Sequence, residues 1–110
     1  LEIPAGGIEP GEGPVATVRR ELREETGCLP RKVERLGGFY SAPGYSSEYL
    51  YLYLASDLAH NPLYAEDTEG IKVVPVPATQ ILRLITSGSI CDAKSIAGLL
   101  TFLDYRRSHQ

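Results

Sequence analysis

The chain has 110 residues, which is the length of a single domain, and its formal net charge at pH 7 is −3. No run of about eighteen apolar residues is present and no signal-peptide pattern opens the chain, so the sequence predicts a cytoplasmic protein rather than a membrane protein. The weakly acidic balance and the absence of a strong Lys/Arg cluster argue against a general nucleic-acid-binding surface.

The first residues have the composition of a strand. Leu1–Ile3 runs directly into a glycine-rich loop, and the chain contains no Met. A chain that starts within a strand is expected to be part of a longer one. We therefore expect residues 1–110 to form a single domain whose upstream part is missing from the sequence.

A glycine-rich segment at residues 6–13 precedes a stretch with helical spacing. Glycine permits sharp bends and a close approach of the backbone to a ligand, whereas Pro14 suits the first turn of a helix. Apolar residues then recur at helical spacing until Gly27, which favours a C-terminal stop. The pattern predicts a loop followed by a helix over residues 14–26.

Three carboxylates lie close together on this predicted helix. Glu21 and Glu25 are one turn apart, and Glu24 borders them. Like-charge pairs on a helix surface cost only about 0.2–0.5 kcal/mol each, so these acids could form an ordinary solvated face among neighbouring arginines. Carboxylate oxygens at this spacing are also the ligands that Mg²⁺ or Mn²⁺ prefers. The glycine loop at a fixed distance upstream, which a solvated face does not require, favours a metal site.

Two strands are predicted after the helix. Residues 32–40 have a strand pattern in which Gly37 and Gly38 mark a bulge or a close approach. In residues 48–54 tyrosines alternate with leucines, which places the rings on one face and the leucines on the other. We expect the tyrosine row to be half-buried sheet packing, because no basic residues are interleaved as on a base-stacking surface.

The remainder of the chain predicts one strand and two helices. Residues 71–76 form a short apolar strand ended by prolines, and residues 79–86 form a helix. The order of elements indicates α/β packing of the α+β kind, with a mixed or antiparallel sheet between helices. The last helix is expected over residues 92–107, with Asp92 as N-cap and with a core stripe of Ile96, Leu99, Leu100 and Leu103.

The segment 6–28 meets the pattern G-x5-E-x7-R-E-U-x-E-E-x-G-U, in which U is a bulky aliphatic residue. Its last position departs, with Cys28 in place of an aliphatic residue. This pattern resembles the Nudix box of the Nudix hydrolases. The resemblance implies a Nudix-type α/β/α sandwich with a mixed sheet, and an enzyme that hydrolyses nucleoside diphosphates linked to another moiety. The matching residues are Gly6, Glu12, Arg20, Glu21, Leu22, Glu24, Glu25 and Gly27.

A second segment narrows the resemblance. Ser41–Glu48 looks like the SPG-x-x-x-E motif of the ADP-ribose pyrophosphatases, and residues 92–97 look like the start of their final helix. This similarity implies a nucleotide-sugar diphosphatase that converts ADP-ribose to AMP and ribose 5-phosphate. It also implies that Gly6, Pro43 and Glu48 belong to the substrate site, with Glu48 at the ribose.

The resemblance also implies roles for the acidic residues. Arg20 and Glu24 would be catalytic, and Arg20 would orient the glutamates. The general base would be Glu66 or Asp67, and the cofactor would be Mg²⁺ or Mn²⁺. The implied metal ligands are the backbone carbonyl of Ala5 and the side chains of Glu21, Glu24, Glu25 and Glu69.

Proteins of that subfamily carry an additional N-terminal region, and its absence here implies exposed strand edges that would pair with another copy. We therefore expect a homodimer that binds a nucleoside diphosphate-linked small molecule. Two other interpretations stay open. One is a non-catalytic Nudix-type module that binds a nucleotide or a partner protein. The other is an acidic protein whose helix binds a cation only for stability.

Overall fold

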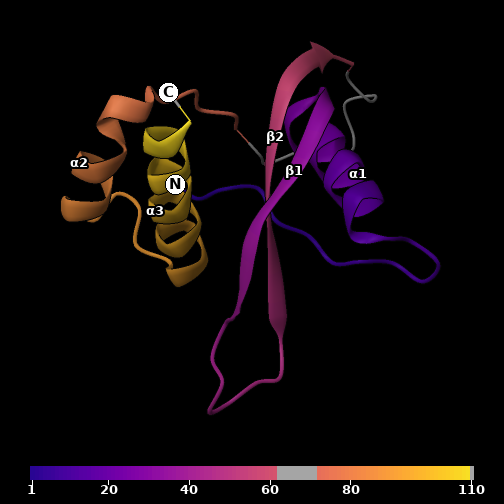
Figure 1. The fold of residues 1–110 in the computed structure, drawn as a ribbon, viewed down its shortest axis with the longest axis horizontal. Helices are drawn as coiled ribbons and strands as arrows, with labels where there is room; N and C mark the ends of the chain where they lie inside the picture. Colours follow the sequence, from indigo (N-terminus) through magenta and orange to yellow (C-terminus); the bar gives the residue numbers. More distant parts are fainter. Residues whose placement is uncertain (62–71, 110) are drawn as a thin grey trace. The chain divides into compact units, whose positions relative to one another are not determined.

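A computed structural model of the chain describes residues 1–61 and 72–109. Their contacts form two compact units. We call Pro4–Arg35 with Tyr53–Val74 the box unit, and Leu1–Ile3 with Leu36–Leu52 and Pro75–Gln110 the C-terminal unit. The elements, shown in Figure 1, are α1 (Pro14–Thr26), β1 (Cys28–Tyr40), β2 (Tyr49–His60), the 3₁₀ turn η2 (Ala78–Gln80), α2 (Ile81–Thr86) and α3 (Ala93–Ser108).

Helix α1 has the predicted bounds. Pro14 occupies its first turn, where the missing N–H has no helical partner to lose. Gly27 ends the helix in the left-handed region at φ 73°, and its N–H donates to the carbonyl of Arg23 at 2.9 Å. A residue with a Cβ atom is disfavoured at that φ, so glycine sets the end of the helix.

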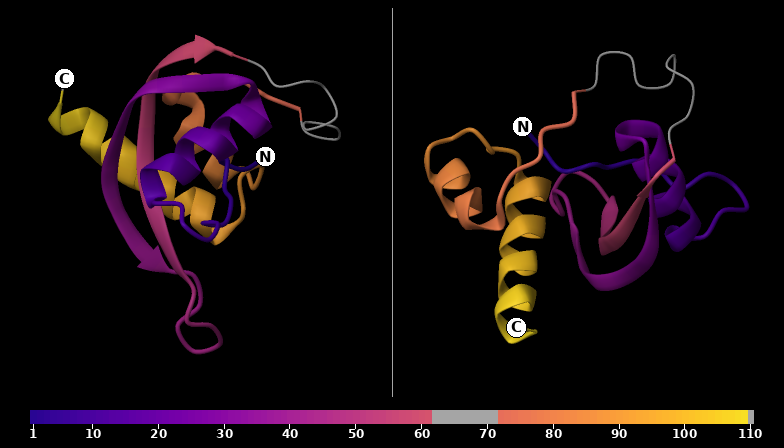
Figure 2. Two further views of the ribbon diagram at one scale, coloured as in Figure 1. Left: turned by 90° about the vertical axis from the view of Figure 1, so that its right-hand side faces the viewer. Right: turned by 90° about the horizontal axis from the view of Figure 1, so that it is seen from above.

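Strands β1 and β2 form a two-stranded antiparallel sheet and run side by side along a curved path (Figure 2). Both strands are longer than predicted, because β1 begins at Cys28 and β2 continues to His60. The pairing extends to the strand ends, where Asn61 donates its N–H to the carbonyl of Gly27 at 2.8 Å. The alternation of tyrosine and leucine stops before this point, so it marks only the first part of β2.

Gly37 and Gly38 of β1 are predicted to mark a bulge or a close approach. The structure shows a close approach, of the Tyr49 ring to Gly38. A Cβ atom on Gly38 would lie 2.7 Å from Cε2 of Tyr49, so the ring packs directly on the backbone. The ring of Tyr49 also meets the rings of Tyr40 and Tyr51 edge-on, with centroids 5.0 and 5.2 Å apart. Tyr49 is 38% exposed and Tyr51 is 46% exposed, so these rings contact each other on an exposed face of the sheet, and the predicted half-burial applies only to Tyr53.

The predicted helix at residues 79–86 begins as η2 and continues as α2. Ile81 and Ile90 are buried in the C-terminal unit, and the Ile90 N–H donates to the carbonyl of Leu84 at 3.0 Å. Helix α3 lies beside α2 in Figures 1 and 2 and begins after Asp92, the predicted N-cap. The Asp92 side chain accepts a hydrogen bond from the Ser95 N–H at 2.9 Å.

The predicted core stripe of α3 is wrong at Leu100, which is 44% exposed. The buried residues of this helix are Ser95 and Gly98. A Cβ atom on Gly98 would lie 3.0 Å from Cδ1 of Ile3 and 3.1 Å from Cδ1 of Leu52. Leu100 is two positions beyond Gly98, about 200° around the helix, and therefore faces away from these contacts.

Two predicted strands are wrong for the residues that the structure describes. Residues 1–3 and 72–76 have no strand conformation, and Ile71 lies outside the described residues. The Ile3 N–H donates to Ser95 Oγ at 3.0 Å instead of to a neighbouring strand. Pro75 has no N–H for a sheet. The α+β class is confirmed, and of the two predicted kinds of sheet, mixed or antiparallel, the sheet of residues 1–61 and 72–109 is antiparallel.

None of the helices in residues 1–61 and 72–109 combines the length and the apolar character that crossing a membrane requires.

Candidate active site on helix α1

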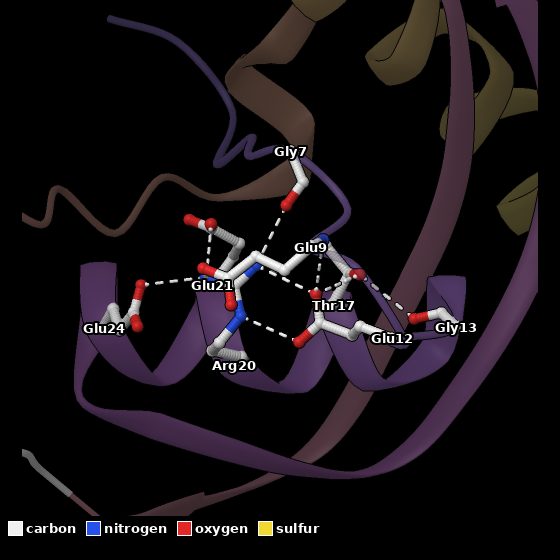
Figure 3. A network of polar contacts seen from close by, with 8 residues as sticks. All are labelled: Gly7, Glu9, Glu12, Gly13, Thr17, Arg20, Glu21 and Glu24. Carbon is white, nitrogen blue, oxygen red and sulfur yellow. Dashed lines mark hydrogen bonds and ion pairs between the residues drawn. The ribbon is translucent and has the colours of Figure 1, made fainter.

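The guanidinium group of Arg20 is the centre of a polar network on α1 (Figure 3). Its Nε and Nη2 donate to the two carboxylate oxygens of Glu12, at 2.8 and 3.0 Å. Its Nη1 donates to Glu21 at 2.8 Å and to Glu24 at 3.3 Å, and Nη2 also donates to the carbonyl of Gly7 at 2.9 Å. The planar fork of donors therefore ties the loop before α1 to two carboxylates on the helix.

The carboxylate of Glu12 has four hydrogen-bond donors, two from Arg20, the Thr17 hydroxyl at 2.7 Å and the Glu9 N–H at 3.2 Å. The hydrogen bonds from Arg20, followed by the one from Thr17, lower the pKa of Glu12 from its ordinary 4.5 to about 2. The same bond to Glu12 raises the pKa of Arg20. Both groups are therefore charged across the neutral range, which keeps the ion pair intact.

The backbone of the glycine loop lies against Glu21. A Cβ atom built on Gly6 would collide with the carboxyl group of the Glu21 side chain. Glycine is needed here for space, so that the loop can approach the helix closely. Ala5, the residue whose carbonyl is the predicted backbone ligand, directly precedes this contact and is exposed.

The acids of α1 suit a hard divalent cation by their chemistry, because Glu21, Glu24 and Glu25 all offer carboxylate oxygens. One carboxylate oxygen of Glu25 is buried. Glu21 and Glu24 are turned toward Arg20, and no three His, Cys, Asp or Glu side chains of residues 1–61 and 72–109 are already gathered for a metal ion. Cation binding at these acids therefore requires a side chain to reorient or a further ligand to join.

The remaining predicted site residues lie elsewhere in the chain. Glu66, Asp67 and Glu69 lie outside the described residues. Pro43 and Glu48 are exposed residues of the loop between β1 and β2, in the C-terminal unit. Their roles in base catalysis, metal binding and substrate binding stay predictions.

Sequence reasoning missed Thr17, which is only 6% exposed and donates its hydroxyl to Glu12. The sequence indicated the position of Thr17 but not its partner. Thr17 precedes Arg20 by three residues and so shares its helix face, and a threonine inside a helix must place its hydroxyl on a partner.

The chain matches the NUDIX domain family over residues 1–97. It is 36% identical over 97 residues to an ADP-ribose pyrophosphatase of Bacillus subtilis (strain 168), a match that covers 86% of this chain and 52% of the relative. It is 35% identical over 98 residues to a methanol dehydrogenase activator of Bacillus methanolicus, covering 87% and 53%. It is 33% identical over 112 aligned residues to a GDP-mannose pyrophosphatase of Yersinia pestis (strain Pestoides F), covering 99% and 54%.

The chain therefore spans about half the length of these curated relatives. A solved structure described as an ADP compounds hydrolase has the same fold, with a TM-score of 0.84 and 24% identity over 93% of this chain and 55% of that one. At this identity the likeness concerns the fold alone. The family match includes the glycine loop, α1 and the whole Arg20 network, and the chain belongs to the NUDIX domain family.

Proposed function

We propose that this chain carries the catalytic centre of a divalent-metal-dependent pyrophosphohydrolase. Its substrate is a nucleoside diphosphate linked to a small molecule, with ADP-ribose, cleaved to AMP and ribose 5-phosphate, as the leading candidate. One observation carries the proposal. Arg20 holds Glu12 of the preceding loop and Glu21 and Glu24 of α1 in one network.

The residues of α1 have distinct tasks in this proposal. Glu21, Glu24 and Glu25, with the Ala5 carbonyl, would hold Mg²⁺ or Mn²⁺, and Nudix hydrolases generally use divalent metals. When bound, such an ion neutralises phosphate charge and makes a water molecule more acidic. Arg20 keeps the side chains of Glu21 and Glu24 oriented.

The loop that contains Glu66, Asp67 and Glu69 completes the proposed site. Glu66 or Asp67 would accept the proton of the attacking water, and Glu69 would add a metal ligand. The attack on one phosphorus then breaks its bond to the bridging oxygen. This bond cleavage produces the two monophosphates.

The proposed substrate class draws support from two relatives whose names are ADP-ribose pyrophosphatase and GDP-mannose pyrophosphatase. Both names denote a nucleoside diphosphate joined to a sugar. The segment Ser41–Glu48, which is similar to a motif of the ADP-ribose pyrophosphatases, favours ADP-ribose between the two. Glu48 would contact the ribose, and Pro43 and Gly6 would shape the substrate site.

A second candidate function has a specific observation in its favour. One relative, at 35% identity, is named a methanol dehydrogenase activator. A Nudix-type module that binds a nucleotide or a protein partner without turnover would fit that name. The complete set of Arg20, Glu21, Glu24 and Glu25 on α1 favours the hydrolase.

The test is to incubate the chain with ADP-ribose and, separately, with GDP-mannose in the presence of Mg²⁺ or Mn²⁺, and to identify products by chromatography. We expect AMP and ribose 5-phosphate from ADP-ribose, and no products after the metal is removed with EDTA. Absence of turnover with both substrates and both metals would contradict the hydrolase and favour the binding module. A rise of Tm with the metal but no turnover would indicate that α1 binds a cation only for stability.

We also propose that the chain acts in the cytoplasm and forms a homodimer. The dimer is tested by light scattering coupled to size-exclusion chromatography at micromolar concentration. The mass of two chains is the expected result, and the mass of one chain would contradict it.

A further inference from the structure

We infer that Thr17 is a positioning residue of the α1 site, because its hydroxyl group fixes the carboxylate of Glu12 and Glu12 in turn fixes the guanidinium of Arg20 (Figure 3). This role rests on the proposed function, in which Glu21 and Glu24 act under the control of Arg20. Thr17 occupies a variable position of the box pattern, and no direct contact with substrate is assigned to it.

The geometry directs the single hydroxyl proton of Thr17 to Glu12. Two acceptors lie within reach of Oγ1, the Glu12 carboxylate at 2.7 Å and the Gly13 carbonyl at 3.0 Å. The Gly13 carbonyl already accepts the Thr17 backbone N–H at 3.0 Å. Hydrogen bonds to a charged acceptor are shorter and stronger than those to a neutral one. The hydroxyl therefore donates to the carboxylate.

This bond attaches the loop carboxylate to the helix at a second point. Glu12 lies before α1, and its long side chain can adopt several rotamers. Ordering Arg20 requires that this side chain be restricted to one of them. Thr17 is well suited to hold it, since a β-branched side chain in a helix has few rotamers and Thr17 is 6% exposed. With the carboxylate fixed, Nε and Nη2 of Arg20 are fixed as well, and Nη1 is directed to Glu21 and Glu24.

Two other threonines show what a purely local role would look like. Thr26 donates its hydroxyl to the carbonyl of Leu22 at 2.6 Å, and Thr101 donates to the carbonyl of Ala97 at 2.8 Å. Each hydroxyl proton is donated within its own helix, four residues back. Thr17 has the same option at Gly13 and in addition a closer carboxylate from the loop. Thr101, in α3, is therefore the matched control.

The experiment compares Thr17→Val, Thr17→Ser and Thr101→Val. Valine keeps the shape of threonine and removes the hydroxyl, whereas serine keeps the hydroxyl. We expect Thr17→Val to lower kcat for ADP-ribose by about tenfold, on the scale of losing a hydrogen bond to a charged group, with KM nearly unchanged. Thr17→Ser restores kcat, and Thr101→Val leaves it at the wild-type value.

A spectroscopic measurement separates this role from the proposed function. In ¹⁵N-labelled protein we expect the Arg20 Nε–H, which donates to Glu12, to exchange slowly with water in the wild type and in Thr17→Ser. It exchanges faster in Thr17→Val. If the wild type cleaves neither ADP-ribose nor GDP-mannose, the proposed function fails, and this exchange rate still decides whether Thr17 positions Arg20.

Three results would overturn the inference. They are an unchanged Arg20 exchange rate in Thr17→Val, a Thr17→Ser variant as impaired as Thr17→Val, and an equal loss of kcat in Thr101→Val. Circular dichroism establishes that each variant is folded. If Thr17→Val does not fold, Thr17→Ala replaces it, and a wild-type Arg20 exchange rate in that variant overturns the inference equally.

Discussion

The two units of the chain use a carboxylate before a helix in different ways. In the C-terminal unit, Asp92 caps α3 by accepting the N–H of Ser95 at 2.9 Å. In the box unit, Glu12 precedes α1, yet α1 has Gly13 as its N-cap and no side-chain cap bond. Glu12 instead accepts from Arg20 and Thr17. One acid stabilises a helix end, and the other organises side chains on a helix face.

Asp92 and Glu12 each have a basic partner, Lys94 and Arg20 respectively, and these two partners connect different parts of the chain. Lys94 bridges Asp92 and Glu2, at 3.1 Å from each, which fastens the first residues of the chain to α3. Arg20 donates hydrogen bonds to three glutamates and a loop carbonyl, and it also forms an ion pair with Glu9 at 3.7 Å. We therefore interpret a charge cluster as a candidate functional site when one cation orders several acids that could share a ligand. Simple pairing with a helix end indicates a structural role.

The largest expected effect is from Arg20→Ala. Removal of the guanidinium leaves Glu12, Glu21 and Glu24 without their shared donor, and we expect kcat/KM to fall on the order of a hundredfold. Arg20→Lys should fall nearly as far, because an ammonium group cannot reproduce the fork of donors. Steady-state kinetics with ADP-ribose measure both. Lys94→Ala is the counterpart in the C-terminal unit, and a comparable loss there would remove the distinction between the two clusters.

A smaller effect is expected from Gly6→Ala, with Gly98→Ala as its counterpart. The new Cβ at Gly6 meets the flexible end of Glu21, which can move only by leaving Arg20, so activity should fall about tenfold while Tm changes little. The new Cβ at Gly98 meets Ile3 and Leu52, so overpacking should lower the free energy of unfolding by about 1–3 kcal/mol with little effect on kcat. Kinetics and thermal melts of both variants would show whether Gly6→Ala mainly lowers activity and Gly98→Ala mainly lowers stability.

Asp92→Ala tests the structural carboxylate by itself. Loss of the N-cap of α3 should lower the free energy of unfolding by about 1 kcal/mol, as for other helix caps, and leave kcat unchanged. Urea unfolding measures the first quantity and the hydrolysis assay the second. A marked fall in kcat with an unchanged free energy of unfolding would reverse the role assigned to Asp92.

The smallest expected effect is a fall of Tm at acidic pH, to which the carboxylates of Glu12 and Asp92 both contribute. The pKa of Glu12 is lowered from 4.5 to about 2, chiefly by Arg20. Burial opposes ionisation of Asp92, but its hydrogen bonds with Ser95 and Lys94 lower its pKa from 3.8 to about 2. A lowered folded pKa stabilises the fold above the ordinary pKa, and this stability is lost as pH falls toward 2. We expect Tm to fall between about pH 4.5 and 2, and Glu12→Gln and Asp92→Asn each to weaken that fall. A Tm profile in which neither variant differs from the wild type would contradict these assignments.

Local signals predicted the elements whose ends depend on nearby residues. Pro14 and Gly27 delimit α1, and Asp92 caps α3, because each acts within one helical turn. Strands depend on partners that the local sequence does not specify. The apolar stretches at residues 1–3 and 72–76 are not strands for that reason.

The same contrast applies to the site. Helix spacing predicted that Glu21, Glu24 and Glu25 are neighbours, and the family resemblance implied that Arg20 orients them. The bond from Thr17 to Glu12 joins helix and loop, and only the fold of the loop determines it. The exposure of Leu100 likewise depends on which side of α3 meets Ile3 and Leu52.

We propose that the acids of α1 perform metal-dependent hydrolysis of a pyrophosphate. The most direct test of this proposal is the initial rate of ADP-ribose hydrolysis with Mg²⁺ for Glu25→Gln and for Glu34→Gln, an identical change at an exposed residue of β1. We expect a loss on the order of a hundredfold for Glu25→Gln and a wild-type rate for Glu34→Gln. Equal rates for the two variants would contradict the proposal.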